Sequence, residues 1–242
     1  MGGREPGTDG MTQTADREIS LPSTTNHGFL ALEGVDGSGK TTTARLIAEH
    51  VRAQGRPLSR IGQHSWLDPQ AARVIIDVRE DRPHRHSHQD ITRAYFRDKQ
   101  LQAGAIGQLL RDRSVLSDRY IFSDAAYLEV LYGIPARETL DRHHAHGTLL
   151  PDLIVYLDVP VNLAADRVVA RGKSMRHYEN SYTLDKVSTV YRSLLLDDPP
   201  PYLPPVHVFR NTTGAHEDSR LLDLFRAVDA PPAPRRQLLE TS

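Results

Sequence analysis

The chain has 242 residues, of which 38% are hydrophobic and 25% are charged, as in an average globular domain. Its formal net charge of −1 predicts no general attraction to nucleic acid or to an anionic membrane, and the lack of cysteine excludes disulfides and thiolate metal sites. The N-terminal segment lacks the apolar run of a signal peptide, and no later segment has the roughly 20 apolar residues of a spanning helix, so we expect a cytoplasmic protein.

The two ends of the chain differ in composition from its middle. Residues 1–26 are polar and rich in Gly, Thr and Asp, which predicts a disordered leader. Residues 230–242 are rich in proline and charge at their start and predict a flexible tail. We expect residues 27–229 to form one domain.

The middle of the chain alternates between short apolar runs and segments with helical spacing of apolar residues. In chain order the sequence predicts a strand at 28–33, a helix at 40–53, a strand at 57–61, a helix at 89–110, strands at 115–116 and 153–159, helices at 163–171 and 184–196, a strand at 206–209 and a helix at 221–228. This alternation predicts an α/β fold with a five-stranded parallel sheet flanked by helices. Polar residues that follow Glu33, Leu116 and Phe209 are expected to face one cleft, at the carboxyl ends of the strands.

The segment between the first strand and the first helix, Gly34–Thr41, reads G-x-x-x-x-G-K-T. Its glycines allow backbone N–H groups to turn toward phosphate oxygens, and the helix that follows presents its positive end. Lys40 would reach the β- and γ-phosphates, and the Thr41 hydroxyl would hold Mg²⁺. The motif predicts the P-loop NTPase fold, with ATP and Mg²⁺ as ligands. The residues expected to bind ATP here are Gly34, Asp36, Gly37, Ser38, Gly39, Lys40, Thr41 and Thr42.

Two common classes of P-loop protein find no support in the sequence, which has neither the N-K-x-D run of a GTPase nor the apolar strand ending in Asp-Glu of an ATPase motor. Four stretches instead resemble the thymidylate kinase family, and together they extend over residues 28–228. They are FLALEGVDGSGKTT (29–42), VLSDRYIFSDAAY (115–127), PDLIVYLDVPVNLAADRVVAR (151–171) and SMRHYENSYTLDKVSTVYRSL (174–194).

The resemblance implies an enzyme of nucleotide biosynthesis that transfers the γ-phosphate of ATP to a deoxynucleoside monophosphate, dTMP first. It also implies a homodimer and a helical lid at about 171–182. Two alternatives stay open. A kinase of the same fold would act on another acceptor, such as dGMP, dCMP, a modified nucleotide or a nucleoside. A regulatory protein would bind ATP without turnover.

The resemblance also assigns roles on the acceptor side. Arg119 would hold the acceptor phosphate, for which a guanidinium is suited because it bonds two oxygens at once. Asp36 would face the sugar 3′-hydroxyl, and Tyr127 would crowd the 2′ position and favour deoxyribose. Asp118 would help to place Mg²⁺ or water, unless it merely pairs with Arg119. The residues expected to bind the acceptor are Asp36, Lys99, Arg119, Ser123, Asp124 and Tyr127.

The presumed lid carries a run of basic residues. Arg171 and Arg176 are our candidates for the cation that neutralises the transferred phosphoryl group, and with Lys40 and Arg119 they complete the predicted catalytic set. Arg167 would pack against adenine, and residues 211–214 would line the adenine pocket. The alternative for the lid arginines is solvated helix charge.

Two departures from the family touch the acceptor base. Residues 62–69 replace an Arg-Glu-Pro-like segment, and the base-contacting arginine reads Lys99, which loses the planar fork. Asp124 stands where small or amide residues are common. A carboxylate would favour a base edge that offers N–H donors, so guanine or cytosine joins thymine as a hypothesis. No function is predicted for the Pro-rich stretch 197–205.

Twelve histidines include clusters at 84–88 and 143–146. They lack the helical spacing and the ordered acidic partners of a metal site, so we expect them to lie in solvated loops.

Overall fold

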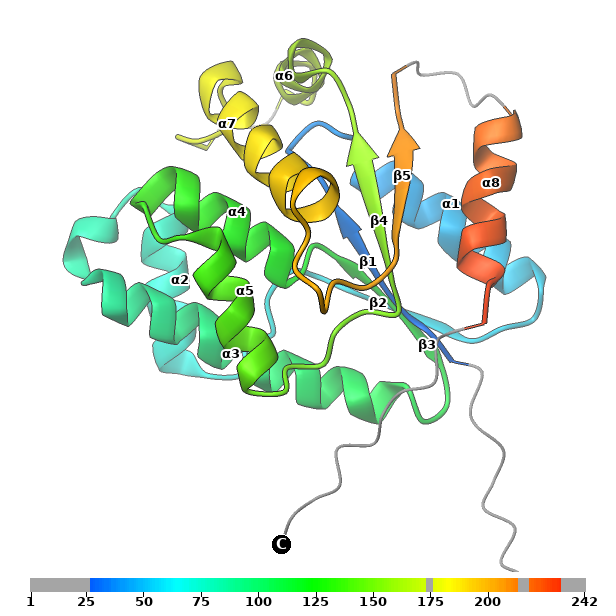
Figure 1. The fold of residues 1–242 in the computed structure, drawn as a ribbon, viewed down its shortest axis with the longest axis horizontal. Coiled ribbons are helices and arrows are strands. Elements are labelled where there is room, and N and C mark those ends of the chain that lie inside the picture. Colours follow the sequence, from blue (N-terminus) through cyan, green and yellow to red (C-terminus); the bar gives the residue numbers. More distant parts are fainter. Residues whose placement is uncertain (1–26, 173–175, 213–217, 232–242) are drawn as a thin grey trace, which may run out of the picture.

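The computed structural model describes residues 27–172, 176–212 and 218–231, with a sheet of five strands at its centre (Figure 1). The strands are β1 (Phe29–Glu33), β2 (Leu58–Ile61), β3 (Ser114–Asp118), β4 (Leu153–Asp158) and β5 (Val206–Arg210). Their order is β2-β3-β1-β4-β5, and each neighbouring pair is parallel. The predicted α/β class and the five-stranded parallel sheet are confirmed.

Helices cover both faces of this sheet. The described helices are α1 (Lys40–Ala53), α2 (Pro69–Arg79), the 3₁₀ turn η1 (Pro83–Arg85), α3 (His88–Leu109), α4 (Ile121–Tyr132), α5 (Ala136–Ala145), α6 (Val161–Ala170), α7 (Ser181–Arg192) with its π-helical extension η2 (Ser193–Asp197), and α8 (Asp218–Asp229). In Figure 1, α1 and α8 lie on one side of the sheet, and α3, α4, α5 and α7 lie on the other. None of these helices has the length and apolar character needed to cross a membrane.

The central strand β1 is buried on both faces because its side chains alternate between two cores. Phe29 and Ala31 pack in the core shared with α3, α4, α6 and α7. Leu30 and Leu32 pack in the opposite core with α1 and α8. A third cluster lies between α2, α3 and α4, away from the sheet. The sheet is therefore rigid where β1 ends, at the start of the P-loop.

The strands and helices predicted from the sequence are all present, but α2, α4 and α5 were not predicted. The apolar residues of helix α4 do not form one stripe, and Ser123 and Asp124 are buried among them, so α4 lacks the helical pattern of an amphipathic surface helix. Helix α2 begins after Asp68, whose carboxylate accepts hydrogen bonds from the N–H groups of Gln70 and Ala71, with Pro69 in the first turn. Asp-Pro is a helix-start signal that the pattern of apolar residues alone misses.

Three predicted segments lie wholly or partly outside the described residues. These are the leader at 1–26, most of the tail at 230–242, and residues 173–175 of the lid. The rest of the presumed lid connects α6 to α7.

The prediction that the histidine clusters lie in solvated loops is wrong for part of each cluster. His143 and His144 belong to α5, and His143 is only 2% exposed, with its Nδ1 3.0 Å from the Thr148 hydroxyl. His86 contacts the Asp77 carboxylate at 3.0 Å. Within the described ranges, no group of three or more His, Cys, Asp or Glu side chains is placed to hold a metal ion.

The Pro-rich stretch at 197–205 packs against α5. Tyr202 stacks on His144 with ring centroids 4.0 Å apart and donates a hydrogen bond to Asp141. Arg137 pairs with Asp198 at 2.9 Å. These contacts hold the connection from η2 to β5 against the helical layer.

Burial of His143 makes stability depend on pH. Burial lowers the pKa of His143 from 6.5 to about 4, so the unfolded chain takes up this proton first as the pH falls. A shift of one pKa unit corresponds to about 1.4 kcal/mol. We therefore expect the unfolding free energy to fall by about 3 kcal/mol between pH 6.5 and 4 because His143 is buried in its neutral form. Urea denaturation across this pH range should show a smaller loss of unfolding free energy for His143→Gln than for the wild type. An equal loss in both proteins would contradict the role of His143 in this pH dependence.

Candidate active site

The P-loop joins β1 to α1 with a backbone that favours glycine at Gly34, Gly37 and Gly39, all of which have positive φ angles. Gly37 and Gly39 have φ angles of 81° and 98°, which disfavour residues with a Cβ. A Cβ on Gly37 would lie 2.1 Å from the Ala164 carbonyl oxygen, and one on Gly39 would lie 2.3 Å from the amide of Asn211. The loop therefore fits against α6 and the end of β5.

The carboxyl ends of three strands meet at this loop, as the polar residues after them led us to expect. Asn211, just after β5, donates a hydrogen bond to the Ser38 carbonyl at 2.8 Å. Arg119, just after β3, donates to the Gly34 carbonyl at 2.9 Å. Of the segment predicted to line an adenine pocket, residues 213 and 214 lie outside the described part of the chain.

Lys40 is buried within the loop that it follows. Its ammonium donates hydrogen bonds to the carbonyls of Gly34 and Val35, at 3.0 and 2.8 Å. Burial, and then repulsion from Arg119, lowers the pKa of Lys40 to about 7. A bound phosphate would oppose both effects, because a nearby negative charge favours the protonated amine. Thr41 and Thr42, at the start of α1, are exposed.

Arg119 connects the P-loop to the acceptor side. One Nη donates to Asp36 at 2.8 Å, and the other donates to Gly34, to the Ser123 hydroxyl at 3.1 Å and to the Tyr191 hydroxyl at 3.3 Å. Its φ of 74° is unfavourable for an arginine and costs about 1–3 kcal/mol. Arg119 forms an ion pair with Asp36 at 2.8 Å rather than with the adjacent Asp118.

Asp36 contacts two of the predicted acceptor-binding residues at once. Its second carboxylate oxygen accepts a hydrogen bond from the Tyr127 hydroxyl at 2.8 Å. Burial opposes the ionisation of Asp36, but Arg119 and Lys40 outweigh that effect and lower the pKa of Asp36 below its ordinary value. The carboxylate is therefore charged, and it can accept a further hydrogen bond from a hydroxyl.

A narrow cavity opens beside these groups. Arg119, Asp36 and Tyr127 line one end of it. Residues of α2, α3 and α4 supply flat and apolar walls, and the lid supplies two more side chains. The other lining residues are Gln63, His64, Val78, Arg79, Tyr95, Asp124, Leu128, Leu131, Tyr132, Arg176 and Tyr178.

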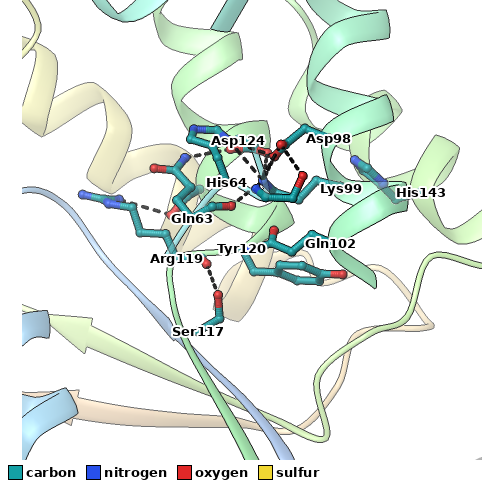
Figure 2. A network of polar contacts seen from close by, with 12 residues as sticks. Gln63, His64, Asp98, Lys99, Gln102, Ser117, Arg119, Tyr120, Asp124 and His143 are labelled. Carbon is teal, nitrogen blue, oxygen red and sulfur yellow. Dashed lines mark hydrogen bonds and ion pairs between the residues drawn. The ribbon is translucent and has the colours of Figure 1, made fainter. Parts of the chain in front are cut away.

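Of the predicted acceptor-binding residues, two do not line this cavity. Ser123 is fully buried behind Arg119, where its hydroxyl contacts Glu33 and Tyr191. Lys99 is also fully buried, and its ammonium donates to the Gln63 carbonyl at 2.5 Å and pairs with Asp98 and Asp124 at 3.1 Å each (Figure 2). Asp124 itself lines the cavity.

Sequence reasoning missed the support of Arg119. Glu33 is fully buried and accepts hydrogen bonds from the Tyr120 N–H, the Ser123 hydroxyl and the Tyr191 hydroxyl. Burial raises its pKa. A charged residue at the end of the apolar strand 28–33 was the available signal. Sequence reasoning also did not predict that Gln63, Arg79 and Tyr95 line the cavity, because their positions depend on how α2 and α3 pack.

The lid residues lie at different distances from the cavity. Arg176 lines it and contacts the Tyr178 hydroxyl at 2.9 Å. Arg171, at the end of α6, pairs with Glu179 at 3.2 Å. One guanidinium nitrogen of Arg167 is buried without a hydrogen-bond partner among the described residues. Asp118 attracts the Lys40 ammonium, which places a carboxylate near the P-loop.

Residues 32–199 match the family model described as Thymidylate kinase. A probable thymidylate kinase of Methanospirillum hungatei is 30% identical over 191 residues, which cover 75% of this chain and 90% of that protein. A probable thymidylate kinase of Methanococcus maripaludis is 27% identical over 202 residues, or 83% of this chain and 94% of that protein. The thymidylate kinase of Leptospira interrogans is 26% identical over 177 residues, or 70% of this chain and 82% of that protein.

The buried cluster around Lys99 gives a testable stability difference. Lys99→Met would leave two buried carboxylates without their shared cation, so we expect a loss of about 3–5 kcal/mol of unfolding free energy. Lys186→Met, an exposed change on α7, should alter it by less than about 0.5 kcal/mol. Urea denaturation measures both. If the two variants are equally stable, Lys99 is not the cation that balances Asp98 and Asp124.

Proposed function

Because this chain belongs to the thymidylate kinase family, we propose that it transfers the γ-phosphoryl group of ATP to the phosphate of a deoxynucleoside monophosphate, with dTMP as the first candidate. A new bond forms between an acceptor phosphate oxygen and the γ-phosphorus, while the bond from that phosphorus to the β-phosphate oxygen breaks and ADP leaves. The observation that carries the proposal is the direct contact between Arg119 and the P-loop, at the mouth of the cavity.

On the donor side, the P-loop supplies the phosphate cradle. Backbone N–H groups at the start of α1 and the Lys40 ammonium are suited to the β- and γ-phosphates. Thr41, exposed at the helix start, and the Asp118 carboxylate near Lys40 are the groups that would hold Mg²⁺. A site with so few protein ligands fits this ion, which usually binds through one or two protein groups and substrate phosphates. Bound there, Mg²⁺ would neutralise charge on the phosphates.

On the acceptor side, Arg119 is suited to hold the acceptor phosphate. Its guanidinium lies between Asp36 and the P-loop, so a small movement would exchange the Asp36 oxygen for a phosphate oxygen. Asp36 would then accept the 3′-hydroxyl of the sugar, and Tyr127, bonded to Asp36, would crowd the 2′ position. Arg176 is the lid cation that lines the cavity, which favours it over Arg171 for the transferred group. A cytoplasmic location and a homodimer, both implied by the resemblance, stay predictions.

The first experiment is a coupled ADP-release assay with ATP·Mg²⁺ and a panel of nucleosides and nucleoside monophosphates. We expect turnover of at least one deoxynucleoside monophosphate and none in Lys40→Met. Turnover of a nucleoside alone would mean that the acceptor is a nucleoside rather than a nucleoside monophosphate. ATP binding without transfer to any acceptor would mean a regulatory protein.

Arg119 separates a nucleotide from a nucleoside acceptor. Arg119→Met should lower kcat/KM for the preferred monophosphate by about 100-fold or more, since a charge-assisted contact to phosphate is worth about 3 kcal/mol. Arg113→Met, at the opposite end of β3 and 43% exposed, serves as the matched control and should leave kcat/KM unchanged. A change of less than about threefold in Arg119→Met would exclude this residue as the phosphate ligand.

A further inference from the structure

A second cluster of charges lies against the cavity (Figure 2). Asp124, Gln63 and His64 line the cavity there, and Lys99 and Asp98 lie behind them. On the proposed function, the sugar and phosphate occupy the end near Arg119, so these groups face the base. Their chemistry decides which base edge fits.

Lys99 is not available to a base. Unlike Asp124, it does not line the cavity; its ammonium donates to the Gln63 carbonyl, while Asp98 and Asp124 surround it. The arginine that lines the cavity from α2, Arg79, lies outside this cluster, with its guanidinium carbon 5.9 Å from the centroid of the Trp66 ring. The only cation in this described cluster instead neutralises carboxylates of the protein.

The cluster carries more negative than positive charge. Asp98 and Asp124 share the single Lys99, and both carboxylates are nearly inaccessible to solvent. Asp98 is further satisfied by the N–H groups of Ser65 and Trp66 and by the Ser65 hydroxyl. His64 adds no positive charge, because burial lowers its pKa. Asp124 receives one further hydrogen bond, from Gln63, and is therefore the less satisfied of the two carboxylates and the one that lines the cavity.

Asp124 also has hydrogen-bonding capacity to spare. One of its oxygens accepts from the Gln63 amide nitrogen at 2.7 Å. The other is paired with Lys99 but is buried without a hydrogen bond among the described residues. Because the Gln63 nitrogen points to Asp124, its amide oxygen turns away and adds another acceptor to this end of the site (Figure 2). Each carboxylate oxygen can accept more than one hydrogen bond, so Asp124 keeps room for a ligand that supplies an N–H group.

We propose that the preferred acceptor is a deoxynucleoside monophosphate whose pyrimidine carries an amino group at C4, as in cytosine, with Asp124 as the residue that accepts the amino hydrogen. This inference rests on the proposed function and names the substrate class of the same site. Thymine presents O4 at that position, and a carbonyl oxygen against a buried carboxylate is repelled; the N3–H donor of thymine lies one ring position away, where cytosine presents an acceptor.

The pair 5-methyl-dCMP and dTMP isolates this edge, because both carry the same sugar, phosphate and methyl group. We expect the kcat/KM ratio of 5-methyl-dCMP to dTMP to exceed 1 in the wild type, by about tenfold. Asp124→Asn offers an amide that can donate to O4, so the ratio should fall by at least about tenfold. Asp141→Asn makes the same chemical change on the exposed face of α5 and should leave the ratio unchanged.

The outcomes separate this inference from the proposed function. Turnover of dTMP with a ratio below 1 in the wild type overturns the base assignment and leaves the kinase activity standing. An unchanged ratio in Asp124→Asn, or a preference for dGMP over both pyrimidines, also overturns it. Failure to phosphorylate any deoxynucleoside monophosphate overturns both. The wild-type comparison decides the matter even if Asp124→Asn does not fold.

Discussion

The contact between Arg119 and the P-loop organises this molecule. The guanidinium touches Gly34 and Asp36 on one side and Ser123 and Tyr191 on the other, so one side chain joins elements that follow β1 and β3 to α4 and α7. A buried cation requires this many acceptors because its desolvation is costly. The same requirement explains why Glu33 is buried behind it, at the end of the central strand. The fold places these groups together, and attraction to Arg119 and Lys40 lowers the pKa of Asp36 and keeps that carboxylate charged.

Two buried charge clusters flank the cavity and differ in composition. The cluster near the P-loop combines Lys40 and Arg119 with Asp36, and it is suited to a ligand that brings negative charge. The second cluster has two carboxylates and one ammonium, and it is suited to a ligand that brings hydrogen-bond donors. A nucleotide has this polarity, with an anionic phosphate at one end and a base edge at the other.

The sequence was informative for features that depend on short stretches of consecutive residues. The P-loop, the five strands and the position of Arg119 after β3 follow from local pattern, because each depends on neighbours in the chain. The place of Lys99 could not be predicted in this way. Nothing in Arg97-Asp98-Lys99 says that the ammonium turns inward to Asp124, since that depends on how α3 packs against α4 and on residues 62–69. Helix α4 was not predicted for a different reason. Nearly every residue of its first half is buried, so its apolar residues do not form the single stripe that identifies a surface helix.

The shared position of Lys99 between Asp98 and Asp124 also constrains how this site can change over generations. Replacing Lys99 alone would bury two negative charges without a cation, and adding a second cation alone would crowd a space already filled. The three charges of Asp98, Lys99 and Asp124 are therefore tied together, so that a change of charge at one of them calls for a compensating change at another.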